Sequence, residues 1–153
     1  MKCMIGMQLP KNILVPTDFS ASSEVALDYA VQLAAKLDAK IHLLNVIGAQ
    51  LIGTEYGVPV TTALMEELIL RDQDRLDQLV ALRAGSASFA PVILETGDAR
   101  AQIEQVARRI DADLIVMGTH GRRGVSRWLL GSVAEAVLRV APCPVLLVRE
   151  GVS

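Results

Sequence analysis

Short apolar runs alternate with longer amphipathic stretches along almost the whole chain. Short runs bounded by glycine, proline or polar residues predict buried strands, whereas apolar residues three or four positions apart predict helices with one core-facing side. The predicted strands cover residues 12–16, 41–47, 91–94, 114–117 and 145–148. The predicted helices follow Ser20 and Asp98 and cover residues 61–83 and 132–140. Five strands therefore alternate with four helices.

This alternation predicts an α/β fold with a mostly parallel sheet. Parallel strands need crossover connections, which are right-handed and place helices against both faces of the sheet. Ser20, with Glu24 in the following first turn, and Asp98 are expected to cap the helices that they precede. Residues 48–60 contain glycines and a proline without a period, and predict a loop. Ligands of such sheets bind at the carboxyl ends of the strands.

Composition narrows the class of protein. A length of 153 residues suits one domain, and 52% hydrophobic against 3% aromatic residues predicts an aliphatic core around strands buried on both faces. The net charge of −2 argues against nucleic acid or an anionic membrane as a partner, so any anion site must be local. Two cysteines and the lack of a long apolar run predict a cytoplasmic protein that does not span a membrane.

The stretch from Gly118 to Ser132 separates the fourth predicted strand from the last helix. Gly118 and Gly121 can wrap main-chain N–H groups around a phosphate, and a helix starting at Gly131 and Ser132 favours an anion at its N-terminus. The alternative is purely structural: Gly118 ends a strand, Gly131 relieves a turn, and Ser132 forms a capping box with Glu135. The residues alone leave both interpretations open.

Two other glycine motifs are absent from this stretch. The sequence has no Gly-x-x-x-x-Gly-Lys-Ser/Thr, and the spacing of Gly118, Gly121 and Gly124 is not Gly-x-Gly-x-x-Gly. A P-loop NTPase and a Rossmann dehydrogenase are therefore not supported.

The spacing Gly-x-x-Gly, nine residues, Gly-Ser resembles the ATP-binding signature of the universal stress proteins. Residues 13–20 look like the opening strand and turn of that family, and residues 143–148 look like its closing strand. The resemblance covers residues 11–149. It implies a single-domain open five-stranded parallel sheet of order 3-2-1-4-5 with helices on both faces, in a nucleotide-binding domain of residues 11–150 after an N-terminal extension of residues 1–10.

The resemblance also implies which residues bind ATP, with Mg²⁺ as the accompanying ion. Pro16, Thr17 and Asp18 would line the adenosine side, with Asp18 reaching the ribose or base, and Val46 would offer backbone groups to adenine. The residues expected to hold the ribose and phosphates, or to complete the set beside them, are Met117, Gly118, His120, Gly121, Arg122, Gly131, Ser132 and Val133. Arg123 and Arg127 are weaker candidates. No residue is assigned to catalysis or to direct metal binding.

Two candidates have a second interpretation, and two features depart from the family. An aspartate just before a helix, such as Asp18, is commonly a cap, and a lone loop histidine, such as His120, is commonly solvated. Asn45 stands where many relatives carry histidine, and the loop at 48–60 is idiosyncratic.

Three functions fit these observations. The first is a nucleotide-responsive stress or signalling protein with little or no ATP turnover. Nucleotide occupancy would change its binding to a protein partner, which the sequence does not identify, or its oligomeric state. The second is a slow ATPase or adenylate-handling hydrolase, with Asp18 or His120 positioning a metal or water. The third is an interaction protein that binds no nucleotide. The intact glycine pattern favours the first. In the strand order that the resemblance implies, the last strand, residues 145–148, lies at an exposed sheet edge, which predicts a homodimer.

Overall fold

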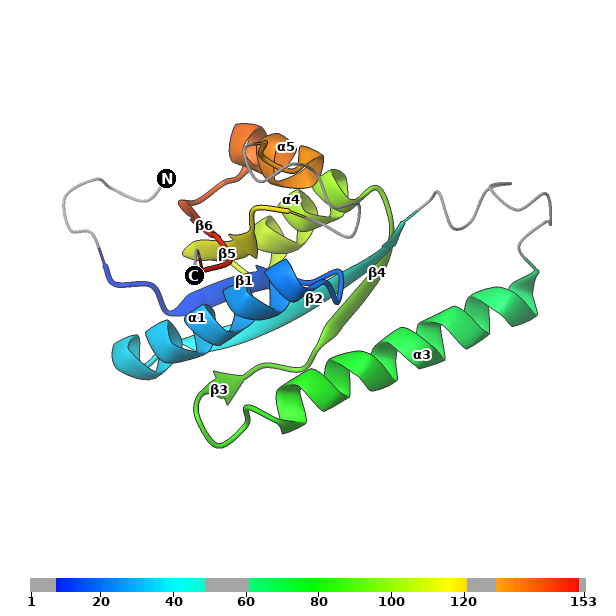
Figure 1. The fold of residues 1–153 in the computed structure, drawn as a ribbon, viewed down its shortest axis with the longest axis horizontal. Coiled ribbons are helices and arrows are strands. Elements are labelled where there is room, and N and C mark those ends of the chain that lie inside the picture. The colour runs from blue at the N-terminus through cyan, green and yellow to red at the C-terminus, as the bar shows by residue number, and fades with distance from the viewer. Residues whose placement is uncertain (1–7, 49–60, 121–128, 152–153) are drawn as a thin grey trace.

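A computed structural model of the protein describes residues 8–48, 61–120 and 129–151. Its elements alternate along the chain (Figure 1). In chain order they are β1 (Asn12–Pro16), α1 (Ala21–Leu37), β2 (Lys40–Gly48), α3 (Thr62–Ala81), β3 (Ser88–Phe89), β4 (Ile93–Gly97), α4 (Ala99–Arg109), β5 (Leu114–Gly118), α5 (Ser132–Val140) and β6 (Val145–Val148). The predicted elements are therefore present, with ends that agree to within a few residues.

The described strands pair in parallel and form a single sheet of order β3-β2-β1-β5-β6, with β4 also pairing with β2. The family order 3-2-1-4-5 is confirmed, because β3 and β4 together occupy the place of the third predicted strand. The α/β class is confirmed as well. The number of strands differs, since the sheet has six strands instead of five.

The third predicted strand is divided into β3 and β4 because the outer segment has one extra residue where it pairs with β2. Ile41 pairs with Phe89 and Leu44 pairs with Ile93, so β2 advances three residues (41 to 44) while the outer chain advances four (89 to 93). Pro91 lies in this interval and has no N–H to donate to a ladder. The prediction of a strand over 91–94 was therefore wrong at its start, and the main pairing begins at Ile93.

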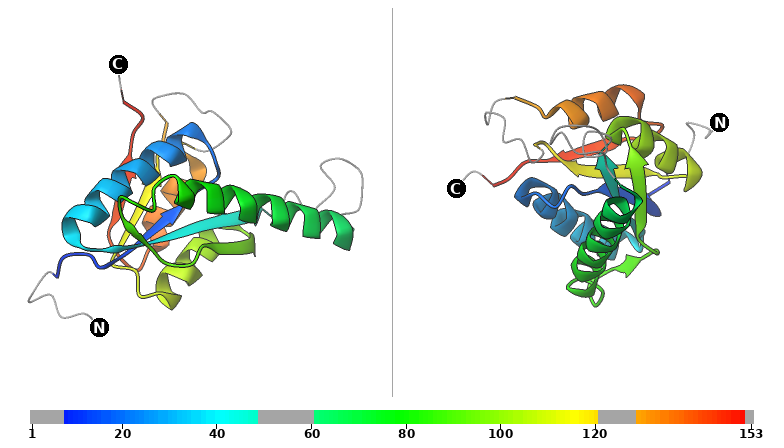
Figure 2. Two further views of the ribbon diagram at one scale, coloured as in Figure 1. Left: turned by 90° about the horizontal axis from the view of Figure 1, so that it is seen from below. Right: turned by 90° about the vertical axis from the view of Figure 1, so that its right-hand side faces the viewer.

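Helices cover both faces of the sheet, as predicted. Helices α1 and α3 lie on one face, and α4 and α5 lie on the other (Figures 1 and 2). Alternate residues of β1 serve the two cores: Ile13 and Val15 pack with α1 and α3, whereas Leu14 packs with α4 and α5. Each of these three side chains is fully buried, as expected for a parallel strand covered on both sides.

The helices begin at the residues that the sequence indicates. Ser20 caps α1 by accepting from the Ser23 amide at 3.2 Å, and Asp98 caps α4 by accepting from the Ala101 amide at 3.0 Å. Helix α3 is capped by Thr61. The N-terminal half of α3 extends away from the sheet (Figures 1 and 2), and the helix buries only Asp72, Leu76 and Leu79. None of the helices in the described ranges is long and apolar enough to cross a membrane.

Candidate functional site

The carboxyl ends of β1, β2 and β5 lie at the same edge of the sheet because the three strands are parallel neighbours. This places the predicted adenosine-side residues, which end or follow β1, beside Val46 of β2 and the end of β5. The described candidates at this edge are Pro16, Thr17, Asp18, Val46, Met117, Gly118 and His120. Gly121, Arg122, Arg123 and Arg127 lie outside the described residues. The topology thus brings together segments that are far apart in the sequence.

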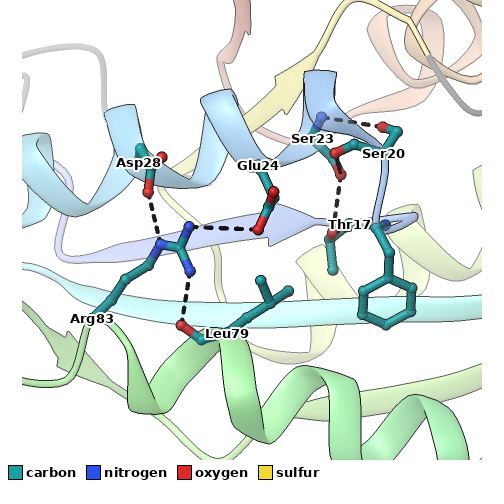
Figure 3. Close-up of polar contacts among 8 residues, drawn as sticks. Thr17, Ser20, Ser23, Glu24, Asp28, Leu79 and Arg83 are labelled. Atoms are coloured by element: carbon teal, nitrogen blue, oxygen red, sulfur yellow. Dashed lines mark hydrogen bonds and ion pairs between the residues drawn. The ribbon is translucent and has the colours of Figure 1, made fainter.

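Thr17 builds the turn between β1 and α1. Its side chain is buried, and its hydroxyl lies 3.0 Å from the Ser23 hydroxyl (Figure 3). The same hydroxyl accepts from the Phe19 amide at 3.1 Å. Its backbone N–H donates to the Leu44 carbonyl at 2.8 Å, and its carbonyl accepts from the side-chain Nδ2 of Asn45 at 2.8 Å. The side chain of Thr17 therefore stabilises the turn. Its effect on a ligand would be indirect, because it fixes the backbone on which Asp18 lies.

Asn45 has a role that its departure from the family pattern did not suggest. It is 5% exposed, and its Nδ2 ties β2 to the Thr17 carbonyl, while its Oδ1 has no partner among the described residues. The Asn45 side chain therefore links β2 to the turn after β1.

Asp18 is not the cap of α1. That place belongs to Ser20, and the Asp18 Oδ1 accepts from the Ser20 amide at 3.0 Å across a two-residue turn. The half-buried carboxylate lies one residue beyond Thr17, at the strand edge. The capping alternative for this residue is excluded, whereas its predicted contact with ribose or base stays a prediction.

Phe19 has the left-handed backbone conformation, with φ at 64°. Bulky residues rarely adopt this region, and such a conformation costs about 1–3 kcal/mol, which the surrounding contacts must offset. Its ring packs against the core beneath α1 and α3, and the Arg75 guanidinium carbon lies 4.0 Å from the ring centroid. The segment that carries Asp18 is thus held in one geometry by its neighbours.

Gly118 is required by packing and not by a positive φ. A Cβ built on Gly118 would lie 2.5 Å from the Ser22 hydroxyl and 2.9 Å from the Ser22 carbonyl oxygen. The residue ends β5 with no positive φ. The structural interpretation of this glycine is therefore confirmed: it lets the first turn of α1 approach the strand end.

Gly131 joins the two ends of the glycine-rich stretch. Its amide donates to the Thr119 carbonyl at 2.7 Å, and a Cβ there would lie 2.9 Å from the same oxygen. Its φ is −60°, so here too close packing explains the glycine. The start of α5 is thereby attached to the end of β5.

His120 lies at this junction and is held on one side. Its amide donates to the Ser22 hydroxyl at 3.4 Å, and its Nδ1 lies 3.0 Å from the Thr119 hydroxyl. Its Nε2 is buried without a partner among the described residues. A buried ring nitrogen is stabilised by a hydrogen bond, so this atom suits contact with a ligand oxygen.

Helix α5 starts without a side-chain cap. Its N-cap is Gly131, and the part of the chain that the structure describes has no side-chain cap hydrogen bond at this helix start. The capping box of Ser132 with Glu135 is wrong, because Ser132 is already the first helical residue and the Glu135 carboxylate pairs with Arg139 at 3.1 Å. The exposed first turn therefore retains N–H groups and a positive dipole end that favour an anion.

A groove of about 480 Å³ runs between the first turns of α4 and α5. Its lining residues are Asp98, Ala99, Arg100, Ser132, Val133 and Ala136. Two predicted phosphate residues, Ser132 and Val133, thus share a groove with an exposed cation, Arg100. Sequence reasoning missed Arg100 because it concentrated on the glycine-rich stretch. The sequence feature that could have indicated Arg100 is that α4 also begins at the carboxyl edge of the sheet, directly after β4.

Acidic and metal-ligating groups are sparse in this region. Among residues 8–48, 61–120 and 129–151, no three His, Cys, Asp or Glu side chains are grouped so that they could hold a metal ion. Asp98 is the acid that lines the groove, and its Oδ2 accepts from the Ala101 amide. Mg²⁺ commonly keeps several waters and binds through substrate phosphates, so a site of this kind can still accommodate it.

Known proteins resemble this chain in sequence and in fold. The model of the universal stress protein family matches residues 10–149. A universal stress protein of Methanocaldococcus jannaschii is 34% identical over 148 residues, with 95% of this chain and 85% of that protein covered. The solved structure of the hypothetical protein MJ0577 superposes with a TM-score of 0.82 at 29% identity, covering 94% of this chain and 98% of that one. A universal stress protein in complex with cAMP superposes with a TM-score of 0.59 at 26% identity, covering 92% and 97%. The chain belongs to the universal stress protein family.

Proposed function

We propose that this protein binds ATP with Mg²⁺ at the carboxyl edge of its sheet and acts as a nucleotide-responsive signalling module with little or no ATP turnover. The observation that carries the proposal is the start of α5. Its first turn has no side-chain cap, opens on the groove, and is attached to the end of β5 by the Gly131–Thr119 hydrogen bond. An uncapped helix N-terminus beside a strand end is a favourable phosphate site.

The phosphate side consists of groups with unused hydrogen-bonding capacity or positive charge. Backbone groups of Ser132 and Val133 would bind the phosphates, with the buried Nε2 of His120 as a further partner for a phosphate or ribose oxygen. Arg100 would add positive charge from the opposite wall of the groove. Mg²⁺ would be held mainly by phosphate oxygens and water, as the ion prefers.

The adenosine side consists of β1, β2 and the turn after β1. Pro16 ends β1, Asp18 follows it with a constrained carboxylate, and Val46 lies near the end of β2. An adenine nucleotide is bound by a relative of the same fold, the universal stress protein in complex with cAMP. This likeness supports an adenine nucleotide as the ligand class.

Low turnover is proposed from the chemistry of the residues at hand. Phosphoryl transfer uses metal-binding carboxylates and a residue that orients the nucleophile. The groove contains Asp98, but its carboxylate caps α4, and Asp18 is engaged with the Ser20 amide. We therefore expect ATP to act as a bound signal in a cytoplasmic protein and not as a rapidly consumed substrate.

The test is calorimetric titration of ATP and AMP, with and without Mg²⁺, into wild type and Gly131→Ala. A methyl group at Gly131 meets the Thr119 carbonyl and displaces the start of α5, so ATP affinity should fall at least tenfold. The matched control is Gly85→Ala, where a Cβ meets nothing within 4 Å, and affinity should stay unchanged.

Each outcome of that experiment separates the candidate functions. Saturable ATP binding that is lost in Gly131→Ala supports the proposed site. Absence of binding to folded wild type would favour the interaction protein. Steady-state phosphate release faster than about one per second, the low end of ordinary enzymes, would favour the hydrolase instead.

A further inference from the structure

Helix α3 reaches the turn after β1 through one cationic side chain. The guanidinium carbon of Arg75 lies 4.0 Å from the centroid of the Phe19 ring. Arg75 is itself directed by Asp72, whose side chain is 6% exposed and whose Oδ1 lies 3.7 Å from Arg75 Nη1. A cation at this distance from an aromatic face is attracted by the ring, so the contact links α3 to Phe19.

The conformation of Phe19 is coupled to that of Asp18. Phe19 has a φ of 64°, and its amide donates to Thr17 Oγ1 at 3.1 Å. The next amide, that of Ser20, donates to the Asp18 carboxylate at 3.0 Å. If Phe19 left the left-handed region, the direction of the Ser20 amide would change and the carboxylate of Asp18 would lose this partner. A residue that holds the Phe19 ring therefore also holds Asp18.

We propose that Arg75 is a positioning residue for the adenosine side of the nucleotide site. It keeps the Phe19 ring in place and thereby maintains the Asp18 carboxylate in its binding geometry. This inference rests on the proposed function, since it concerns the residue expected to reach the ribose or base. It adds an element, α3, that contributes no residue to the predicted nucleotide-binding set.

Arg71 provides a matched control for Arg75. Both arginines lie on α3 and both contact the same oxygen, Asp72 Oδ1, with Arg71 at the shorter distance of 3.0 Å. Only Arg75 also stacks on Phe19. Replacing either arginine disturbs the partner set of the buried Asp72, but only replacement of Arg75 releases the ring.

The experiment measures adenosine and inorganic tripolyphosphate binding by calorimetry for wild type, Arg75→Met, Arg75→Lys and Arg71→Met. In Arg75→Met, adenosine affinity should fall by about two- to fivefold, the change expected for loss of an exposed cation–π contact, while tripolyphosphate affinity stays at the wild-type value. Arg75→Lys keeps a cation over the ring and should recover most of the affinity. Arg71→Met should bind both ligands like wild type.

A second readout does not depend on any ligand. The Phe19 and Ser20 amides should exchange with deuterium faster in Arg75→Met than in wild type or Arg71→Met, because their acceptors are Thr17 and Asp18 within the released turn. The inference is overturned if adenosine affinity is unchanged in Arg75→Met, if Arg71→Met has the same effect, or if the two amides exchange at the wild-type rate. Wild type that binds neither ligand, with exchange still faster in Arg75→Met, would instead refute the nucleotide function alone and leave the coupling of α3 to the turn standing.

Discussion

At the scale of single residues, close packing explains two glycines that the sequence pattern associates with phosphate. Gly118 faces the first turn of α1, where a Cβ would lie 2.5 Å from the Ser22 hydroxyl and 2.9 Å from backbone atoms of Ser22. Backbone atoms cannot move aside as a flexible side chain can. A ligand signature and a packing requirement therefore coincide at the same position, and substitution tests them together.

Gly118→Ala should destabilise the fold before any ligand is considered. The added methyl group overlaps the Ser22 backbone, so the free energy of unfolding should decrease by about 1–3 kcal/mol. Urea denaturation followed by circular dichroism measures this change. Gly85→Ala is the control, because it has open space and should alter stability by less than about 1 kcal/mol. Equal stability of Gly118→Ala and wild type would contradict the packing explanation.

His42 makes stability depend on pH. Its pKa is lowered by burial and, to a smaller extent, by the nearby Lys40 ammonium group, and its Nε2 lies 3.1 Å from Asn12 Oδ1. Because the unfolded chain binds the proton at a higher pH than the folded chain, the contribution of neutral His42 is fully present above the unfolded pKa of about 6.5. It decreases as pH falls through the lower folded pKa.

The corresponding measurement compares wild type with His42→Gln in urea at pH 7.5 and pH 5. Carboxylates contribute equally to both proteins, so the difference between their unfolding free energies isolates His42. The advantage of wild type over the variant should shrink at pH 5. A difference that is constant or grows on acidification would contradict the lowered pKa.

At the scale of elements, α3 packs against the rest of the domain mainly through its C-terminal half. Arg83, just beyond the helix, is 13% exposed, and its Nε donates to Asp28 at 2.7 Å while its Nη1 donates to the Leu79 carbonyl at 3.0 Å (Figure 3). Glu24 lies 3.8 Å from Nη2. One side chain thus joins α1 to the end of α3.

Arg83→Met should lower the free energy of unfolding by about 1–2 kcal/mol, because it removes charge-assisted hydrogen bonds between two helices. Arg108→Met removes an exposed pair with Glu104 within one helix, at 3.1 Å, and should change stability by no more than about 0.5 kcal/mol. Chemical denaturation of both variants gives the comparison. Similar losses in the two would show that Arg83 is an ordinary surface cation.

Element order and most helix starts were predictable because they depend on local patterns. Ser20 and Asp98 cap their helices as expected, and β1, α5 and β6 have the predicted bounds. The division of the third strand was not predicted, since it depends on register against β2. The role of Ser132 was also misjudged, because Gly131 occupies the cap position and sequence spacing cannot distinguish the two.

At the scale of the whole molecule, parallel topology assembles the candidate site from distant segments. The convergence of β1, β2 and β5 was predictable from the strand–helix alternation together with the sheet order that the resemblance to the universal stress proteins implies. The contributions of Arg100 from α4 and Arg75 from α3 were not, because they depend on how the helices lie against the sheet edge. Exposed arginines on helices are common, so only the three-dimensional arrangement distinguishes these two.

Strand β6 forms one outer edge of the sheet. This strand pairs with β5 on one side and is half-buried along its length. Val145 and Leu147 pack toward the core beneath α4 and α5, and Leu146 and Val148 pack toward the core beneath α1 and α3. A short aliphatic strand at an edge presents backbone groups that a second copy can pair with. We therefore expect a homodimer through β6, seen by light scattering as twice the mass of one chain across micromolar concentrations. Strand β5 pairs with β6 and leads into the Thr119–Gly131 junction of the proposed nucleotide site. If nucleotide occupancy is communicated to the β6 interface, titration with ATP should shift the dimer dissociation constant. A monomeric mass at every concentration would refute the dimer, and a dissociation constant that ATP leaves unchanged would show that the signal leaves the protein by another surface.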